Sequence, residues 1–216
     1  MSDSLHVQID GLRYHRTPLG CLPGVTTVLS NTKSPRDKAG LARWKRKVGE
    51  AEAERIKQAA CDRGSALHQA IENYLQEKPL DLESCYLPLF ESVEPLLDQV
   101  QTIAHIEVPT YHPLGYGGSP DLIAEYKGHL TVLDWKTASK PKQRSYIKDY
   151  ILQVCAYIQS SNWLFGYEIE RGLIVVAVEG EPKCQTFAVT PKQYAKGRLE
   201  FQARLEAFQS NYSCNF

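Results

Sequence analysis

Two short apolar segments joined by Lys127-Gly128 constrain the fold of this chain more than any other feature. Residues 121–126 and 129–135 are rich in Leu, Ile, Val and Thr, a composition that favours strands. A two-residue connection with glycine, where a positive φ is required, is typical of a tight β-hairpin. We therefore predict an antiparallel pair of strands that turns at Lys127-Gly128.

The register of this hairpin places two carboxylates face to face. Counting outward from the turn pairs Tyr126 with His129 and brings Asp121 opposite Asp134. Directly opposed residues have Cβ atoms about 5 Å apart on one face of the sheet, so the two negative charges repel each other. A bound divalent cation would reverse the sign of that interaction. An ordinary structural hairpin is the alternative, but it leaves the opposed acids unexplained.

Lys136 and Trp135 complete the predicted catalytic set. Strand alternation puts Lys136 on the same face as Asp134 and turns Trp135 away, while the Trp135 carbonyl stays near the metal as a further candidate ligand. Metal-assisted phosphodiester hydrolysis needs acidic ligands for Mg²⁺ or Mn²⁺, with coordination positions open for phosphate and water. Lys136 can orient the attacking water and stabilise the charged transition state. We therefore predict a metal-dependent phosphodiesterase site.

The distribution of charge is more informative than its sum. Lys plus Arg and Asp plus Glu both number 25, so the net charge does not indicate a nucleic-acid partner. Between positions 33 and 57, however, nine basic residues stand against four acids, whereas acids dominate between 77 and 107. Ser34-Pro35 is a typical helix start, and it predicts a basic helix from Arg36 to about Val48. This helix is either a solvated face packed through Leu41 and Trp44 or a surface that binds nucleic acid.

The order of elements predicts one α/β domain with a mixed sheet flanked by helices. We expect residues 1–216 to form a single domain, with a mainly helical DNA-binding portion (1–100) and a catalytic sheet portion (101–216). Asp10-Gly11 predicts a small hairpin. We expect a short β-branched segment at 25–30 that leads into a helix. The expected strands are 103–110, a doubly buried strand at 172–178 and its antiparallel neighbour at 183–189. The expected helices cover 51–61, 66–76 after a break at Arg63-Gly64, 89–100, 146–165 and 192–209.

Several classes of protein are not expected. The longest apolar run, Leu173–Val178, is too short to span a bilayer, so we expect no membrane association. The N-terminal residues resemble neither a signal peptide nor a transit peptide, which predicts a cytoplasmic protein. The six cysteines are too far apart in sequence for a zinc or iron–sulfur signature.

The residues of the hairpin resemble a known family. Asp121, followed thirteen residues later by Asp134-Trp135-Lys136, resembles the PD-(D/E)XK nuclease superfamily, and the literal Pro120-Asp121 is present. His68 upstream, with Gln153 and Tyr157 downstream, looks like the additional motifs of its RecB-type branch. The segments PGVTTVLS, ARWKR, GGSPDLIAEYKGHLTVLDWKTASKPK, LQVCAY and RGLIVVAV are similar, in this order, to mitochondrial exonucleases of that branch.

The resemblance implies a Mg²⁺- or Mn²⁺-dependent exonuclease that acts on single-stranded DNA ends. It implies that His68 joins Asp121 and Asp134 at the metal, although a single histidine on an amphipathic helix is more often structural. Gln153 and Tyr157 would face the site and position the scissile phosphate or stack a base. The missing transit peptide favours a bacterial or phage relative, and the scattered cysteines predict no iron–sulfur cluster. No obligate protein partner is expected.

The DNA-binding residues are predicted partly from charge and partly from the resemblance. Trp44 and the basic residues around it could form an arch over the strand, and the basic loop after Thr137 lies where it can contact phosphates. Two alternatives stay open: an endonuclease on flapped or branched DNA, and a non-catalytic nucleic-acid-binding accessory protein. The predicted DNA-binding set is Thr26, Thr27, Arg43, Trp44, Lys45, Arg46, Arg63, Lys140 and Lys142.

Overall fold

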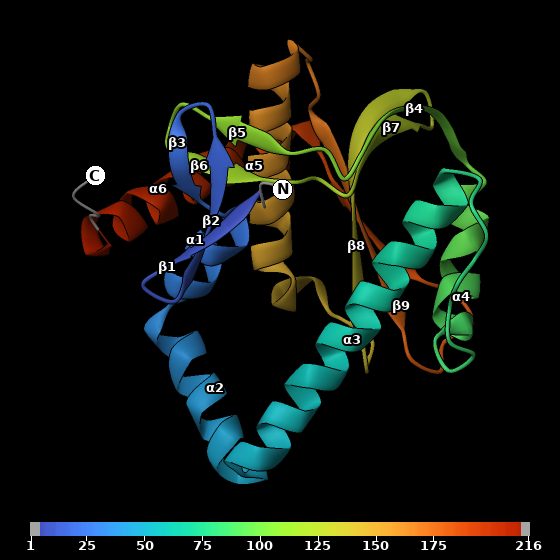
Figure 1. Cartoon of the computed structure of the whole chain (residues 1–216), viewed down its shortest axis with the longest axis horizontal. Helices are drawn as coiled ribbons and strands as arrows, with labels where there is room; N and C mark the ends of the chain where they lie inside the picture. The colour runs from blue at the N-terminus through green and yellow to red at the C-terminus, as the bar shows by residue number, and fades with distance from the viewer. Residues whose placement is uncertain (1–4, 213–216) are drawn as a thin grey trace.

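A five-stranded mixed sheet forms the centre of the molecule (Figure 1). The computed structural model describes residues 5–212. The strand order is β10-β9-β8-β7-β4, and all neighbours are antiparallel except β8 and β9, which the helix α5 (Lys148–Phe165) connects as a parallel pair. The strands are β4 (Val100–Ile106), β7 (Leu122–Tyr126), β8 (His129–Ala138), β9 (Arg171–Val178) and β10 (Gln185–Val189).

The predicted hairpin register is confirmed. Lys127 and Gly128 both have positive φ angles, 52° and 77°, as a two-residue turn of this kind requires. Tyr126 pairs with His129, and the ladder continues to Leu122 opposite Leu133. Asp121 lies one position beyond the last ladder pair, so the same count brings it level with Asp134.

Helices cover both faces of the sheet and make two hydrophobic cores. One core contains α1 (Val25–Asn31), α5 and α6 (Pro191–Asn211), and the other contains α3 (Glu50–Leu75) and α4 (Leu87–Leu97). Ile174 and Val176 of β9 contribute to the first core, while Leu173, Val175 and Ala177 contribute to the second. The prediction that this strand is buried on both faces is therefore confirmed.

The helix α2 (Pro35–Val48) and residues 50–62 of α3 project from the body as a V (Figure 1), and we call residues 35–62 the arch. The side chain of Ser34 caps α2 by accepting a hydrogen bond from the Asp37 amide, as expected. No residue of α2 is buried, and Trp44 is 37% exposed. Of the two alternatives for this helix, packing through Leu41 and Trp44 is therefore not what the structure shows, because both side chains are exposed and the helix stands clear of the core.

Two helix predictions also need correction. Residues 25–30 form α1 rather than an extended segment, because Val25, Val28 and Leu29 are buried at helical spacing against the first core. The expected break at Arg63-Gly64 is absent, and α3 is one helix of 26 residues. Glycine weakens a helix by only about 1 kcal/mol, so packing of the apolar stripe beyond it against β8 can keep the helix continuous.

The expected strand at 103–110 is divided. β4 ends at Ile106, Glu107 has a φ of +47°, and β5 (Thr110–His112) pairs instead with β6 (Tyr116–Gly118). The N-terminal portion also contains a three-stranded sheet of β1 (His6–Ile9), β2 (Leu12–Thr17) and β3 (Gly20–Pro23), whose first turn is the predicted Asp10-Gly11 hairpin. Within residues 5–212, no helix has the length and apolar character needed to cross a membrane.

Candidate active site

The site is built on the open edge of one strand. β7 stops pairing with β8 at Leu133, whereas β9 accompanies β8 to Ala138, so beyond Leu133 one edge of β8 has no neighbouring strand. The Trp135 N–H on this edge donates to Asp121 Oδ2 at 2.7 Å. The Trp135 carbonyl lies 3.0 Å from His68 Nε2. Because a carbonyl only accepts, His68 Nε2 carries the proton in this contact.

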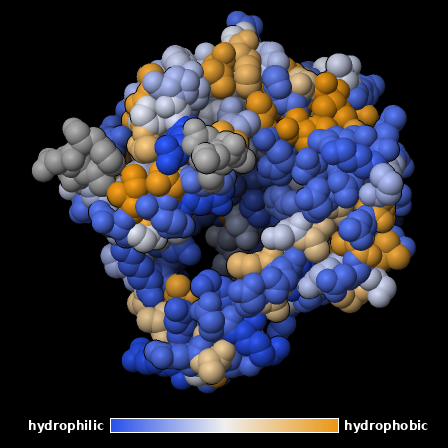
Figure 2. Space-filling model, viewed as in Figure 1, coloured by the Kyte–Doolittle hydropathy of each residue, from blue (hydrophilic) through white to orange (hydrophobic). Residues whose placement is uncertain are grey.

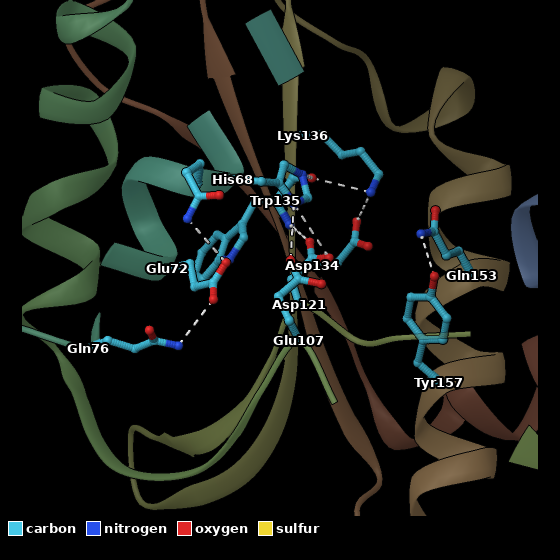
Figure 3. A network of polar contacts seen from close by, with 11 residues as sticks. His68, Glu72, Gln76, Glu107, Asp121, Asp134, Trp135, Lys136, Gln153 and Tyr157 are labelled. Carbon is cyan, nitrogen blue, oxygen red and sulfur yellow. Dashed lines mark hydrogen bonds and ion pairs between the residues drawn. The ribbon is translucent and has the colours of Figure 1, made fainter. Parts of the chain in front are cut away.

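The three residues expected on one face of the sheet lie together (Figure 3). Asp134 is fully buried, and its Oδ2 is 2.6 Å from Lys136 Nζ. Its other oxygen, Oδ1, has no hydrogen-bond partner among the described residues. Asp121 is 7% exposed, and its carboxylate points into the same space. The Trp135 ring packs in the opposite core, as alternation requires.

His68 brings a second acid to the site. His68 Nδ1 lies 3.6 Å from Asp121 Oδ1 and 3.5 Å from Glu107 Oε1. One ligand atom from each of these three residues lies within 4.8 Å of the others. Since Nε2 is turned to the Trp135 carbonyl, Nδ1 faces two carboxylates, which favours a proton or a cation between them.

Glu107 lies beside His68 and Asp121, and sequence reasoning missed it. It follows β4 directly, and its amide donates to the Asp121 carbonyl at 3.0 Å. Pairing of Ile106 with Leu122 brings it beside Asp121, but counting from a turn could not reach it because β4 has two register shifts. The sequence offered one signal for Glu107, an acidic residue in the strand that precedes the Asp121 hairpin. The positive φ of Glu107 is visible only in the structure.

Burial and mutual attraction shift the pKa values of these groups in ways that suit a cation site. Burial raises the pKa of Asp134 to about 6, with Lys136 opposing the shift, and burial also raises the pKa of Asp121. Burial alone would lower the pKa of His68, but the carboxylates of Asp121 and Glu107 raise it to about 9. Burial likewise opposes the charge of Lys136, yet Asp134 and Asp121 raise its pKa.

The donor set fits a hard divalent cation. Asp121 and Asp134 offer buried carboxylate oxygens, Asp134 Oδ1 lacks a hydrogen-bond partner among the described residues, and the Trp135 carbonyl lies beside them. Carboxylate and carbonyl oxygens are the ligands that suit Mg²⁺ and Mn²⁺. His68 and Glu107 complete the possible ligand set on the side of α3. Of the predicted metal ligands, His68 and Asp121 therefore lie close enough to share one ion with Glu107, while the Asp134 carboxylate points into the same space (Figure 3).

Gln153 and Tyr157 line the other side of the site, on α5 (Figure 3). Both are nearly buried, and Gln153 Nε2 donates to the Tyr157 hydroxyl at 3.1 Å. Gly118 permits this placement, because a Cβ at that position would lie 2.6 Å from Tyr157 Cε1. Tyr150, which the sequence did not single out, lies with its ring centroid 5.4 Å from Lys136 Nζ.

The predicted DNA-binding residues occupy different environments. Thr27 is buried and its hydroxyl donates to the Arg13 carbonyl, whereas Thr26 is exposed. The Arg63 side chain is 10% exposed and pairs with Glu179 at 2.7 Å, which joins α3 to the end of β9. The structure thus gives Thr27 and Arg63 contacts within the protein. The remaining set is accessible: Arg43, Trp44, Lys45, Arg46 and Lys140 are exposed, and Lys142 is half-buried.

Comparison with characterised proteins finds mitochondrial genome maintenance exonuclease 1 from three animals. The chain is 31% identical to the Mus musculus protein over 209 residues, covering 89% of this chain and 61% of the relative. It is 36% identical to the Homo sapiens protein, covering 74% and 51%, and 33% identical to the Xenopus tropicalis protein, covering 76% and 50%. The chain therefore spans between half and three-fifths of the length of these relatives. The expected bacterial or phage origin stays a prediction.

A solved structure and a family model complete the comparison. A crystal structure of a proposed exonuclease from Eubacterium rectale aligns with a TM-score of 0.49 at 12% identity, covering 70% of this chain and 68% of that one. The family model described as the PD-(D/E)XK nuclease superfamily matches residues 39–162, more than half of the chain. That range contains His68, Glu107, the hairpin acids, Lys136 and the Gln153–Tyr157 pair. The chain therefore belongs to the PD-(D/E)XK nuclease superfamily.

Proposed function

We propose that this protein is a Mg²⁺- or Mn²⁺-dependent exonuclease that hydrolyses single-stranded DNA from its ends. The observation that carries the proposal is the set of Asp121, Asp134, Lys136 and His68 on the open edge of β8. This set lies between α3 and α5, the two helices that, with α2, border the hollow seen in Figure 2. The name exonuclease carried by the similar mitochondrial proteins supports the same activity.

Asp121, Asp134, His68 and the Trp135 carbonyl would hold the metal, with Glu107 as a further acid. When bound, Mg²⁺ or Mn²⁺ polarises a phosphoryl oxygen and lowers the pKa of a water molecule. The protein supplies the geometry for this chemistry. The Trp135 amide fixes one oxygen of Asp121 at 2.7 Å, and Lys136 fixes one oxygen of Asp134 at 2.6 Å. Each carboxylate keeps its second oxygen for another partner.

Lys136 and the pair on α5 would act on the substrate. Asp134 and the Trp135 carbonyl orient Lys136 Nζ, and its raised pKa keeps it an ammonium. An ammonium here can hydrogen-bond the attacking water and stabilise negative charge on the phosphate. Burial raises the pKa of Tyr157, so its hydroxyl stays protonated and can donate to a phosphate oxygen.

The charges of the arch are evidence for a single-stranded DNA substrate. Six basic residues lie on α2 against one acid, and none of the six has an acidic group within 4 Å in the part of the chain that the structure describes. On residues 50–62 of α3, by contrast, Arg55 pairs with Glu52 at 2.7 Å and Lys57 with Glu54 at 2.9 Å. Unpaired cations beside the exposed Trp44 suit binding of backbone phosphates and bases without sequence preference.

Digestion of a matched set of substrates tests the proposal. End-labelled single-stranded DNA, double-stranded DNA, single-stranded RNA and a closed single-stranded DNA circle are incubated with Mg²⁺ or Mn²⁺. We expect release of label from linear single-stranded DNA, an intact circle, and no activity in Asp134→Ala or with EDTA. Cutting of the circle would instead show an endonuclease. Absence of cleavage on every substrate, with binding retained, would show a non-catalytic accessory protein.

A further inference from the structure

We propose that Tyr146 is a base-stacking residue, and that the cavity it lines receives an unstacked nucleobase of the substrate strand. Tyr146 lies in the short 3₁₀ helix η1 (Arg144–Tyr146), immediately before α5. Its side chain is 75% exposed, the largest value among the exposed large hydrophobic residues of the described chain. This inference rests on the proposed function, since it names a position where the same strand is held.

Tyr146 lies close in the chain to side chains that line the active site. Tyr157, Gln153 and Tyr150 follow one another on α5 at intervals of four and three residues, the spacing of one helix face, and Tyr146 precedes this helix in η1. Gln153 and Tyr157 face the catalytic set, and the Tyr150 ring lies beside Lys136 Nζ. Tyr146 comes four residues before Tyr150, so their Cα atoms are at most about 14 Å apart. A strand held at the metal can therefore reach it within a few nucleotides.

The cavity beside Tyr146 lies where the arch joins the body. It has a volume of about 490 Å³, within the range of small-molecule sites. Lys33 lines it from the segment before α2, Asp37 and Leu41 line it from α2, and Arg204 lines it from α6. This places the cavity at the lower end of α5, next to the hollow between α2, α3 and α5 (Figure 2).

The charges of the cavity favour a neutral ring over a phosphate. Three basic and three acidic residues line it, so they balance. Two of the acids are already paired, Asp149 with Arg204 at 3.2 Å and Glu200 with Lys148 at 2.5 Å. The Tyr146 ring and Leu41, which is 46% exposed, give the cavity an apolar part of its lining. A planar nucleobase can stack on an aromatic ring, whereas its phosphates would be left to the basic arch.

Affinity and kinetics of three variants test the role of the ring. Tyr146→Ala removes it, Tyr146→Phe keeps it, and Trp163→Ala removes an exposed aromatic residue at the other end of α5 as the matched control. Stacking of one base is worth roughly 1–3 kcal/mol, so we expect Tyr146→Ala to weaken single-stranded DNA binding and to raise KM roughly tenfold. Its kcat at saturating substrate should stay within about twofold of the wild type. Tyr146→Phe and Trp163→Ala should bind as the wild type does.

An abasic scan shows whether the group that stacks on Tyr146 is a base. Oligonucleotides with one abasic sugar at successive positions are bound in Mg²⁺-free buffer, which prevents cleavage. In the wild type, one position should lose as much affinity as Tyr146→Ala does, and in Tyr146→Ala that position should cause no further loss. Equal binding by wild type and Tyr146→Ala, or additive losses at every position, would overturn the inference while leaving the proposed function intact. A wild type that neither binds nor cleaves single-stranded DNA would overturn both.

Discussion

The active site and the arch handle charge in opposite ways. At the site, Asp134 is fully buried, and its charge is balanced by Lys136 at 2.6 Å. On α2, no residue is buried and the basic side chains project into solvent without ion pairs among the described residues. A buried charge depends on its partner for stability, whereas an exposed one does not. Substitutions at the site should therefore change stability and activity together, and substitutions on the arch should change binding alone.

The largest effect is expected at Lys136. Lys136→Met should lower kcat by about 10²–10³, because it removes a charge that acts on the transition state. It should also destabilise the metal-free protein by roughly 3–5 kcal/mol, because it leaves the Asp134 carboxylate buried and unpaired. Urea unfolding in EDTA and steady-state kinetics measure the two effects.

A double variant separates these two effects. Asp134→Asn together with Lys136→Met removes both charges, so most of the stability should return while activity stays absent. If the single and double variants unfold at the same urea concentration, the pairing of these two charges does not govern the stability of the site.

The next largest effect is expected for the stability gained on adding Mg²⁺, which variants of the active site should lose and variants of the arch should keep. Mg²⁺ that binds only the folded protein stabilises it by about 2.7 kcal/mol at one hundred times its Kd. Thermal unfolding with Mg²⁺ or EDTA should show this increase in the wild type and in an arch variant carrying Arg43→Glu, Lys45→Glu and Arg46→Glu. Asp121→Asn and His68→Asn should lose it. An unchanged increase in Asp121→Asn would contradict the assignment of the metal ligands.

Glu107 should show an intermediate effect. Glu107→Gln keeps the shape of the side chain but removes a carboxylate 3.5 Å from His68 Nδ1, so Mg²⁺ affinity or activity should fall roughly 10–100-fold. A Mg²⁺ titration of the cleavage rate measures the change. Glu125→Gln, on the hairpin but paired opposite Leu130, is the matched control and should have no such effect. Identical titration curves for the two variants would exclude Glu107 from the site.

The smallest effect on the fold is expected on the arch. Removing a cation that neutralises one phosphate lowers the slope of log affinity against log salt by about 0.7 for a single strand, so reversing Arg43, Lys45 and Arg46 should lower it by up to about 2. The free energy of unfolding should change by no more than about 0.5 kcal/mol. The variant Arg55→Glu with Lys57→Glu is the control. It replaces two basic side chains that already form ion pairs on α3, so it should change the slope less. An unaltered slope in the first variant would make α2 a solvated face without a role in binding.

Predictions that depended on local rules were confirmed at the site. The turn at Lys127-Gly128 sets the register, and alternation then places Asp121, Asp134 and Lys136 together and Trp135 apart. Predictions that needed distant contacts were less complete. Val25–Asn31 became a helix because its apolar residues meet α5 and α6, and α3 continued through Gly64 because its far half packs on the sheet.

The sequence by itself determined the hairpin, the opposed acids beside a lysine and the basic helix, because turn geometry, alternation and helix capping act between neighbours in the chain. Only the tertiary structure decided where β7 leaves β8, which opens the edge that the Trp135 amide and carbonyl occupy. It also decided that Glu107 joins His68, since irregular pairing of β4 cannot be counted from a turn. Contacts between distant segments depend on how whole layers pack, and a local pattern does not contain that information.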